Sequence, residues 1–271
     1  MLHYKTYELA KDKDWVIFIH GAGGSSSIWY KQIREFKPHF NILLVDLRGH
    51  GKSKQFIERY MQNKYTFHDI GLDVIEVMDF LKIQSAHFVS ISLGSIIVRS
   101  IGEVQPNRIL SMTLGGAIIR LNIRSKILMN IANKIKKMVP YMWIYTLFAW
   151  IIMPRSRHKE SRSMFIREAK RLYQKEFLRW YQLTAEVNPL LRFFHEKELP
   201  VPTLYIMGDE DHMFLPQVKQ VIKKHQYGLL EVLQDCGHVV NIDQSDIFNK
   251  IAIRFIQNPQ KYELGFYEKI S

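Results

Sequence analysis

One short stretch of the chain, residues 87–98, constrains the fold more than any other. An apolar run rich in β-forming residues ends at Ser90, Ser92 follows two positions later, and an apolar helical pattern starts directly after it. This order predicts a strand that turns sharply into a helix, with Ser92 at the apex. Such a turn is strained and needs small residues two positions before and two positions after the serine. Ser90 and Gly94 occupy these positions.

The segment Ser90–Gly94 is a near-match to Gly-x-Ser-x-Gly, a turn that holds a serine hydroxyl clear of the backbone as a nucleophile. Ser90 stands where glycine is usual. Neither Ser90 nor Ser95 has a glycine two residues later, so Ser92 is the candidate nucleophile. The alternative is an ordinary turn serine.

Short apolar runs alternate with helical patterns along most of the chain, which predicts an α/β fold: a mostly parallel, twisted sheet with helices on both faces. The predicted strands are Lys5–Leu9, Trp15–His20, Asn41–Asp46, Ala86–Ser90, Leu110–Gly115, Thr203–Gly208 and Leu229–Leu233. The predicted helices are Phe67–Leu81, with a capping box of Thr66 and Asp69, and Leu93–Val104, Pro216–His225 and Gln244–Gln257.

The alternation stops between Ile118 and Leu199, where amphipathic helical stretches such as Ile123–Met138 and Ser163–Leu183 replace it. We therefore predict one core built from residues 1–117 and 201–271, with a helical cap, residues 118–200, inserted between two core strands. The apolar block Tyr141–Met153 within this insertion has two interpretations. Its apolarity on every side favours burial as the cap's own core. The alternative is an apolar lid that lines an acyl pocket or touches lipid.

Positive charge is concentrated in the same segment. The net charge of the chain is +12, and residues 117–200 contain seventeen Lys or Arg against six Asp or Glu, a net charge of +11. A solvated helical face is one interpretation, and weak attraction to anionic membrane surfaces or to negatively charged substrates is another. No nucleic-acid partner is expected, because no recognition-helix, zinc or RNA-binding signature accompanies the charge.

A serine nucleophile needs a base to take its proton and an acid to orient that base. The strand Thr203–Gly208 ends in Asp209, Glu210 and Asp211, and His238 follows the last predicted strand. The carboxyl ends of parallel strands share one edge of a sheet, so these groups are expected near Ser92. We assign Asp211 as the acid and His238 as the base, with Asp209 as the rival acid.

A glycine-rich loop, His20–Gly24, directly follows an apolar strand. Glycines there let the backbone approach a reacting carbonyl. We expect the backbone N–H groups of Ala22 and Leu93 to form the oxyanion hole. His20 is expected to pack and hydrogen-bond beneath this loop. The turn Asp46–Ser53 is expected to be structural, with Arg48 paired locally.

These motifs together resemble the α/β-hydrolase superfamily. The matching segments are His20–Gly24, Asp46–Ser53, Ser90–Gly94, Gly208–Asp211 and Cys236–His238. The resemblance implies an α/β-hydrolase fold, a triad of Ser92, Asp211 and His238, and a variable lid that shapes the substrate pocket. It does not fix the substrate, because this fold serves many reactions. Serine at the turn argues against the haloalkane dehalogenases and epoxide hydrolases of this fold, which use aspartate there.

The sequence does not support several other kinds of site or protein. The glycines at 21, 23 and 24 miss the third position of a dinucleotide-binding loop, and no cluster has metal-ligand spacing, so no cofactor or metal is expected. A single cysteine, Cys236, excludes an internal disulfide and, with no secretory signal at the N-terminus, favours a cytoplasmic location. No charge-free apolar run approaches the ~20 residues of a membrane-spanning helix.

The sequence therefore predicts a serine hydrolase of the carboxylesterase or lipase-like class, which acts on an apolar acyl substrate through an acyl-enzyme. A C–C bond hydrolase or a thioester hydrolase on the same triad is the first alternative. A receptor that binds a small molecule without turnover is the second. The sequence does not indicate the oligomeric state.

Overall fold

The computed structural model describes residues 1–53, 65–120, 127–128, 130–132, 134, 138–185 and 197–262. In this part of the chain seven strands form one sheet in the order β1-β3-β2-β4-β5-β6-β7. The strands are β1 (Tyr4–Tyr7), β2 (Trp15–Ile19), β3 (Asn41–Val45), β4 (Ala86–Ile91), β5 (Ile109–Gly115), β6 (Thr203–Gly208) and β7 (Gly228–Leu233). The edge strand β1 pairs antiparallel with β3, and all other pairs are parallel.

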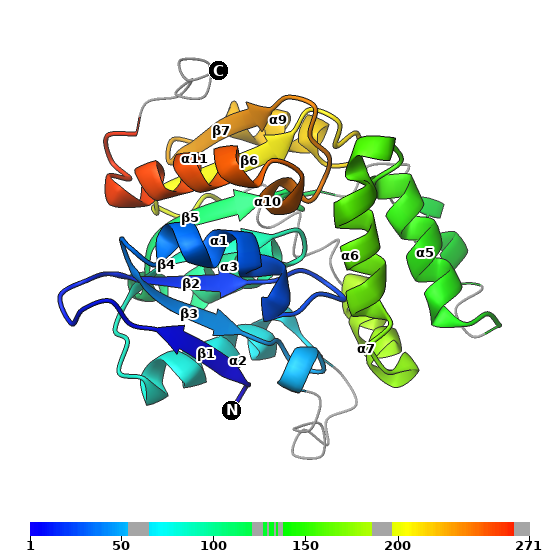
Figure 1. Cartoon of the computed structure of the whole chain (residues 1–271), viewed down its shortest axis with the longest axis horizontal. Coiled ribbons are helices and arrows are strands. Elements are labelled where there is room, and N and C mark those ends of the chain that lie inside the picture. The colour runs from blue at the N-terminus through cyan, green and yellow to red at the C-terminus, as the bar shows by residue number, and fades with distance from the viewer. Residues whose placement is uncertain are drawn as a thin grey trace.

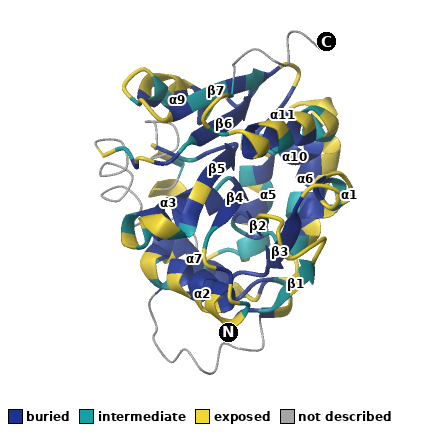
Figure 2. Cartoon of the chain, turned by 90° about the vertical axis from the view of Figure 1, so that its left-hand side faces the viewer, coloured by how far each residue is buried: buried dark blue, intermediate teal, exposed yellow. Residues whose placement is uncertain are grey.

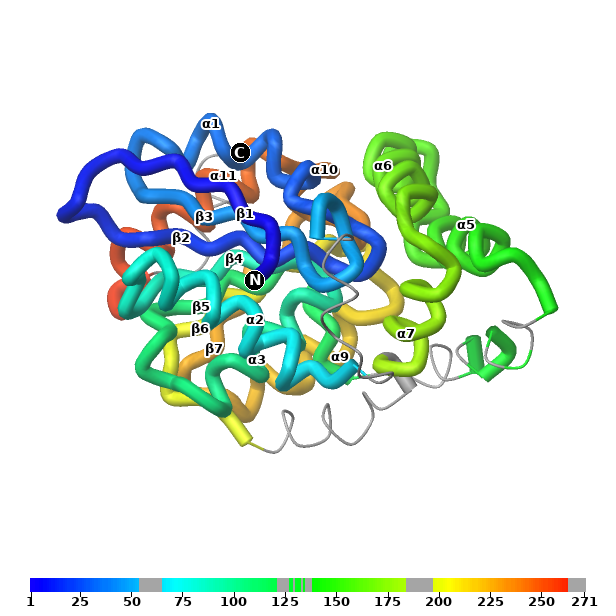
Figure 3. The backbone as a smooth tube through the Cα atoms, turned by 90° about the horizontal axis from the view of Figure 1, so that it is seen from below, coloured from blue at the N-terminus to red at the C-terminus, as the bar shows by residue number. Residues whose placement is uncertain are grey.

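Helices cover both faces of this sheet (Figures 1 and 3). On one face lie α2 (Phe67–Phe80), α3 (Gly94–Val104) and α9 (Leu215–Ile222), and on the other lie α1 (Tyr30–Phe36), α10 (Val240–Asp243) and α11 (Ser245–Gln257). Single 3₁₀ turns occur at Ser26–Trp29, Pro106–Arg108 and Ser156–His158. This is the α/β-hydrolase arrangement of a mostly parallel sheet between two helical layers.

Alternate residues of each central strand enter two separate cores. In β2, Ile17 and Ile19 pack with the layer of α2 and α3, whereas Val16 and Phe18 pack with the layer of α1 and α11. Because both faces of the sheet are covered, β2 is apolar throughout. Figure 2 shows that the central strands are buried, whereas many exposed residues lie on the outer sides of the helices.

A helical region is inserted between β5 and β6. It contains α5 (Tyr141–Ile152), α6 (Lys159–Ala169) and α7 (Gln174–Ala185), which lie together at one end of the sheet (Figures 1 and 3). Its helices share a small core of their own that includes Ile144, Tyr145 and Phe177. Within the described residues, none of the helices combines the length and the apolarity that crossing a membrane requires.

Most predicted core elements are confirmed. Each predicted strand overlaps an observed one within about two residues, and the Thr66 hydroxyl caps α2 by accepting a hydrogen bond from the Asp69 N–H at 3.0 Å. The short helices α1 and α10 were not predicted. The predicted stretch Ile123–Met138 lies largely outside the described residues.

The predicted stretch Ser163–Leu183 is not one helix but two, α6 and α7. A tertiary contact stabilises the break. The Tyr141 hydroxyl lies 2.6 Å from the Leu172 carbonyl oxygen and 3.3 Å from that of Ala169, so it can donate to the Leu172 carbonyl just past the end of α6. Leu172 is buried in the cap core beside them. No local pattern in the sequence reveals a partner 28 residues away.

The packing predicts that truncating two different phenylalanines lowers the free energy of unfolding by unequal amounts. Phe255 on α11 is fully buried, whereas Phe80 on α2 is 62% exposed. We expect Phe255→Ala to lower the free energy of unfolding by about 3–5 kcal/mol, because it leaves a cavity in the core. Phe80→Ala should lower it by less than about 0.5 kcal/mol, as surface changes usually do. Urea denaturation followed by circular dichroism measures both, and equal losses would contradict this assignment of the core.

Candidate active site

Ser92 lies at the apex of the turn between β4 and α3, as the sequence predicts. Its φ of +54° is in the left-handed region, which a residue with a side chain adopts at a cost. The Ser92 N–H donates to the Gly115 carbonyl at 2.9 Å, which joins the turn to β5. A Cβ atom on Gly94 would stand 2.6 Å from the Ile19 carbonyl oxygen, so only glycine fits there without moving the backbone. Ser90 is fully buried and is accommodated at the end of β4.

Three groups that are far apart in the sequence meet at the carboxyl ends of β4, β6 and β7. His238 Nε2 lies 2.9 Å from Ser92 Oγ, and His238 Nδ1 lies 2.7 Å from Asp211 Oδ2. An ionised carboxylate accepts hydrogen bonds and does not donate them, so Nδ1 carries the proton and Nε2 is left to accept the Ser92 hydroxyl proton. Asp211 and His238 are both almost fully buried.

The two candidate acids, Asp209 and Asp211, have different hydrogen-bond partners. Asp209 Oδ1 accepts the backbone N–H of Cys236 at 3.1 Å and so fixes the loop that carries the histidine. Asp211 contacts His238, and its second oxygen accepts the Phe214 N–H at 3.1 Å. The Phe214 ring also packs against the imidazole, with 5.1 Å between the ring centres.

The glycine-rich loop after β2 lies against the Ser92 turn. A Cβ atom on Gly21 would stand 3.1 Å from Ser92 Cβ and 3.6 Å from the Leu93 nitrogen. Ala22 lines the space in front of Ser92. The backbone segments of Ala22 and Leu93, the two predicted oxyanion donors, therefore come together beside the serine.

Two buried histidines support this loop from beneath. His20 Nε2 accepts the Leu47 N–H at 3.0 Å, so its Nδ1 carries the proton and donates to the Gly21 carbonyl at 2.8 Å. His50 Nε2 accepts the Gly23 N–H at 2.9 Å, and the two imidazole rings lie 5.0 Å apart. His20 thus hydrogen-bonds beneath the loop, as its position in the sequence predicts, and both histidines serve as acceptors in their neutral form.

The turn Asp46–Ser53 is structural, and Arg48 within it forms an ion pair with a residue 25 positions further along the chain. Its Nε lies 2.6 Å from Asp73 Oδ2 on α2, in a buried ion pair. Asp46 instead organises the turn by accepting the N–H groups of Ser26 and Lys52. Burial alone would raise the pKa of Asp46, but the two backbone hydrogen bonds, together with the nearby His20 and Ser26 side chains, lower it.

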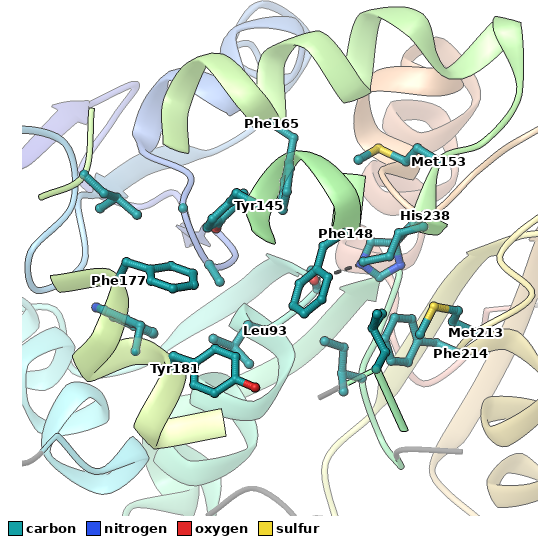
Figure 4. A pocket seen from close by; sticks show the side chains of 18 residues that line it. Leu93, Tyr145, Phe148, Met153, Phe165, Phe177, Tyr181, Met213, Phe214 and His238 are labelled. Atoms are coloured by element: carbon teal, nitrogen blue, oxygen red, sulfur yellow. Dashed lines mark hydrogen bonds between the residues drawn. The ribbon is translucent and has the colours of Figure 1, made fainter. Parts of the chain in front are cut away.

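An apolar cavity of about 160 Å³ lies in front of Ser92 and His238. Figure 4 shows aromatic side chains of the cap pointing into it opposite His238. These come from α5, α6 and α7, and two further side chains come from the loop after β6: Tyr145 and Phe148 of α5, Phe165 of α6, Phe177 and Tyr181 of α7, and Met213 and Phe214. None of the described residues that line the cavity is a Lys, Arg, Asp or Glu.

A second cavity, of about 40 Å³, adjoins the same serine. It shares Ala22, Ser92, Phe165 and His238 with the first, so Phe165 stands between the two spaces. Its wall is more polar, because Glu168 belongs to it. Met164 and Glu168 also border a groove on the surface, so the second cavity and this groove have two lining residues in common.

The sequence motifs did not identify the residues that hold the cap over the site. Buried carboxylates join cap and core at three places. Glu168 accepts the Ser25 hydroxyl at 2.7 Å, Glu176 accepts the Tyr65 hydroxyl at 2.7 Å, and Glu210 of the core pairs with His158 of the cap at 2.8 Å. A signal for two of them exists, because Glu168 and Glu176 are among only six acidic residues in a strongly basic segment. An isolated acid there is a candidate for a buried contact.

No group of three or more His, Cys, Asp or Glu side chains in the described ranges is arranged to hold a metal ion. Cys236 is fully buried beside the histidine loop. Burial raises the pKa of its thiol, so the thiolate needed for nucleophilic or redox chemistry is disfavoured. The serine, the imidazole and the carboxylate are therefore the candidate reactive groups of this site.

Comparison with known proteins decides the family. The sequence profile of the alpha/beta hydrolase fold matches residues 14–245. The chain belongs to the α/β-hydrolase fold family. The match spans strands β2 to β7, the inserted helices and the residues Ser92, Asp211 and His238, which agrees with the motifs that suggested the family.

Other α/β-hydrolases resemble the chain over nearly its whole length. It is 23% identical to 3-oxoadipate enol-lactonase 1 of Acinetobacter baylyi, over 90% of this chain and 89% of that protein. Its fold matches an enol-lactonase from Burkholderia xenovorans LB400, with a TM-score of 0.76, 22% identity and coverage of 95% and 96% of the two chains. It also matches a thermophilic esterase from Thermogutta terrifontis, with a TM-score of 0.78, 15% identity and coverage of 96% and 94%.

The buried histidine beneath the loop makes stability depend on pH. Desolvation lowers the pKa of His20 below its usual 6.5, despite the hydrogen bond to Gly21. The unfolded chain therefore binds a proton before the folded protein does as the pH falls below about 6.5, and the free energy of unfolding decreases there. The decrease approaches about 1.4 kcal/mol per pH unit for one such histidine.

Urea denaturation between neutral and mildly acidic pH measures this slope. We expect His20→Gln to make it shallower, whatever the variant's absolute stability. The matched variant His68→Gln changes an exposed side chain and should keep the wild-type slope. A slope that His20→Gln leaves unchanged would show that this histidine does not carry the effect.

Proposed function

We propose that the protein is a serine hydrolase that cleaves carboxylic esters of apolar acids. One observation carries the proposal: the chain of short contacts from Ser92 through His238 to Asp211 opens directly into an apolar cavity. The contacts supply an activated nucleophile, and the cavity supplies a place for an apolar acyl group beside it.

In the proposed reaction, His238 Nε2 takes the proton of Ser92 Oγ as this oxygen attacks the ester carbonyl carbon. The negative charge moves to the carbonyl oxygen, where the N–H groups of Ala22 and Leu93 stabilise it. His238 then gives the proton to the leaving alcohol, and the acyl group stays on Ser92. Water, deprotonated by His238, attacks this acyl-enzyme and releases the acid. Asp211 holds the imidazole in the required tautomer and stabilises its charged form.

The larger cavity supports an acyl group of limited size. Its volume of about 160 Å³ is close to that of an engineered apolar cavity, about 150 Å³, that binds benzene. Acyl groups of roughly this size, such as hexanoyl or benzoyl, fill such a space, whereas a long fatty acyl chain exceeds it. The absence of Lys, Arg, Asp and Glu from the described lining favours an uncharged acyl group, since a buried charge there would lack a partner.

The smaller cavity supports a compact alcohol as leaving group. It shares Ser92 and His238 with the larger cavity, so an ester bound in both spaces would place its alcohol in the smaller one. Lactones are cyclic esters and react by the same steps. Because the A. baylyi relative is named as an enol-lactonase, apolar lactones belong in the set of substrates to be tested.

Replacement of the nucleophile tests the chemistry. We expect Ser92→Ala to lower kcat/KM for p-nitrophenyl hexanoate by at least about a thousandfold and to abolish labelling by a fluorophosphonate probe, because no hydroxyl remains within reach of His238. Ser90→Ala is the matched control, since Ser90 is buried two residues away and does not contact the imidazole. It should keep both signals, and full activity of Ser92→Ala would refute the mechanism.

The cavity wall predicts a change in chain-length preference. Phe148 of α5 points into the larger cavity, and its neighbour Leu147 is exposed on the same helix. We expect Phe148→Ala to shift the optimal p-nitrophenyl ester towards acyl chains longer by about two to four carbons, because truncation removes apolar bulk from the wall. Leu147→Ala should leave the profile unchanged. An identical profile for wild type and Phe148→Ala would place the acyl group elsewhere.

The same measurements separate the alternatives. Turnover of acyl thioesters or of ring-cleavage products, with no turnover of any oxygen ester or lactone, would assign the triad to thioester or C–C bond hydrolysis. Fluorophosphonate labelling without turnover of any of these compounds would favour a small-molecule receptor. Either result would overturn the proposed ester hydrolase.

A further inference from the structure

Helix α5 is apolar on two opposite sides, and only one side faces the protein. Ile144, Tyr145 and Ala149 are buried towards the cap core, and Tyr145, Phe148 and Ile152 line the larger cavity. On the other side, Trp143 is 70% exposed, Leu147 48%, Trp150 51% and Ile151 41%. These four positions follow the spacing i, i+4, i+7, i+8, so they form one continuous stripe. We call this stripe the outer face of α5.

The outer face contradicts the interpretation that the whole apolar block is buried as the cap's core. Figures 1 and 3 place α5 on the outer side of the cap, away from the sheet. Met138, just before the helix, is 82% exposed. A single exposed apolar residue is ordinary, but a contiguous stripe with two tryptophans marks a surface that another apolar phase covers.

The charge around this stripe indicates what kind of apolar surface covers it. Residues 117–200 have a net charge of +11. Exposed cations stand at both ends of the helix in sequence, with Lys134 before it and Arg155 and Lys159 after it. The guanidinium of the buried Arg162 lies 3.6 Å from the centre of the Trp150 ring, so a cation also lies directly beneath the stripe. Such a charge repels a second copy of the same cap and attracts a surface of opposite sign.

We propose that the outer face of α5 docks onto anionic lipid membranes, with the helix lying in the plane of the interface. Tryptophan and leucine would enter the boundary between headgroups and acyl chains, and the cap's Lys and Arg side chains would contact lipid phosphates. The helix has 12 residues and a length of about 18 Å, shorter than a ~30 Å hydrocarbon core, so it lies on the membrane and does not cross it. The inner face of the same helix then forms a wall between the bilayer and the cavity.

Vesicle flotation tests the docking face. The full-length protein is mixed with vesicles of phosphatidylcholine alone or of phosphatidylcholine with phosphatidylglycerol, at low and high salt. We expect binding to the anionic vesicles that falls as salt rises, because surface charge is screened within about 10 Å at 0.1 M salt. Tryptophan emission should shift to shorter wavelength on binding.

A double variant separates the apolar stripe from general electrostatics. Trp143→Gln with Leu147→Gln keeps every charge and should weaken binding by about tenfold or more, because two large apolar side chains no longer enter the interface. The matched control is Phe80→Gln, which removes a 62% exposed aromatic from α2 and should bind as wild type. All three proteins should hydrolyse a soluble short-chain ester at the same rate, so the docking result is independent of the proposed activity.

Three outcomes would overturn the proposal. One is the absence of binding to anionic vesicles at low salt. Another is equal binding of the double variant and wild type, which would leave the outer face without a role. The third is a stable wild-type dimer, measured by light scattering, that the double variant converts to monomer without any vesicle binding. That result would assign the stripe to a protein interface.

Discussion

The site depends on how closely the Ser92 turn approaches the end of β2. Gly94 lies so near the Ile19 carbonyl that no side chain fits between them. This contact lets the serine adopt its left-handed conformation and brings the glycine-rich loop beside it. The parallel sheet then delivers Asp211 and His238 to the same edge, because the strands that precede both residues end there. Strain at one residue is thus tolerated because neighbouring strands fix its surroundings.

Buried carboxylates join the cap to the core, although the cap segment carries a strongly positive net charge. Glu168 and Glu176 belong to the cap, and Glu210 belongs to the core. A carboxylate that accepts a hydrogen bond in a buried place is hard to replace, since its loss leaves the partner unsatisfied. The aromatic wall of the cavity is therefore held at a fixed distance from Ser92, and cavity size becomes a property of the cap.

Helix α5 links the cavity to the outside of the protein. Phe148 and Leu147 are adjacent in sequence, yet one lines the cavity and the other faces solvent. A helix that is apolar on all sides is usually buried on all sides. Here the outer face has no cover within the described part of the chain, and it belongs to the most basic segment. An apolar stripe within a cationic surface suits the boundary of an anionic membrane, where both properties are favourable at once.

The sequence by itself determined the sheet, its flanking helices and the order of the three groups at its edge. Strand periodicity, the Ser90–Gly94 turn and the residues after β6 and β7 are local signals, and short-range sterics produce them. The tertiary structure decided what depends on distant partners. It placed Asp211 in contact with His238, paired Arg48 with Asp73, and divided the predicted helical stretch Ser163–Leu183 into two helices at the Tyr141 contact. It also decided that α5 is buried on one face only, because burial depends on which neighbours pack against a helix, and the helix's own residues do not specify them.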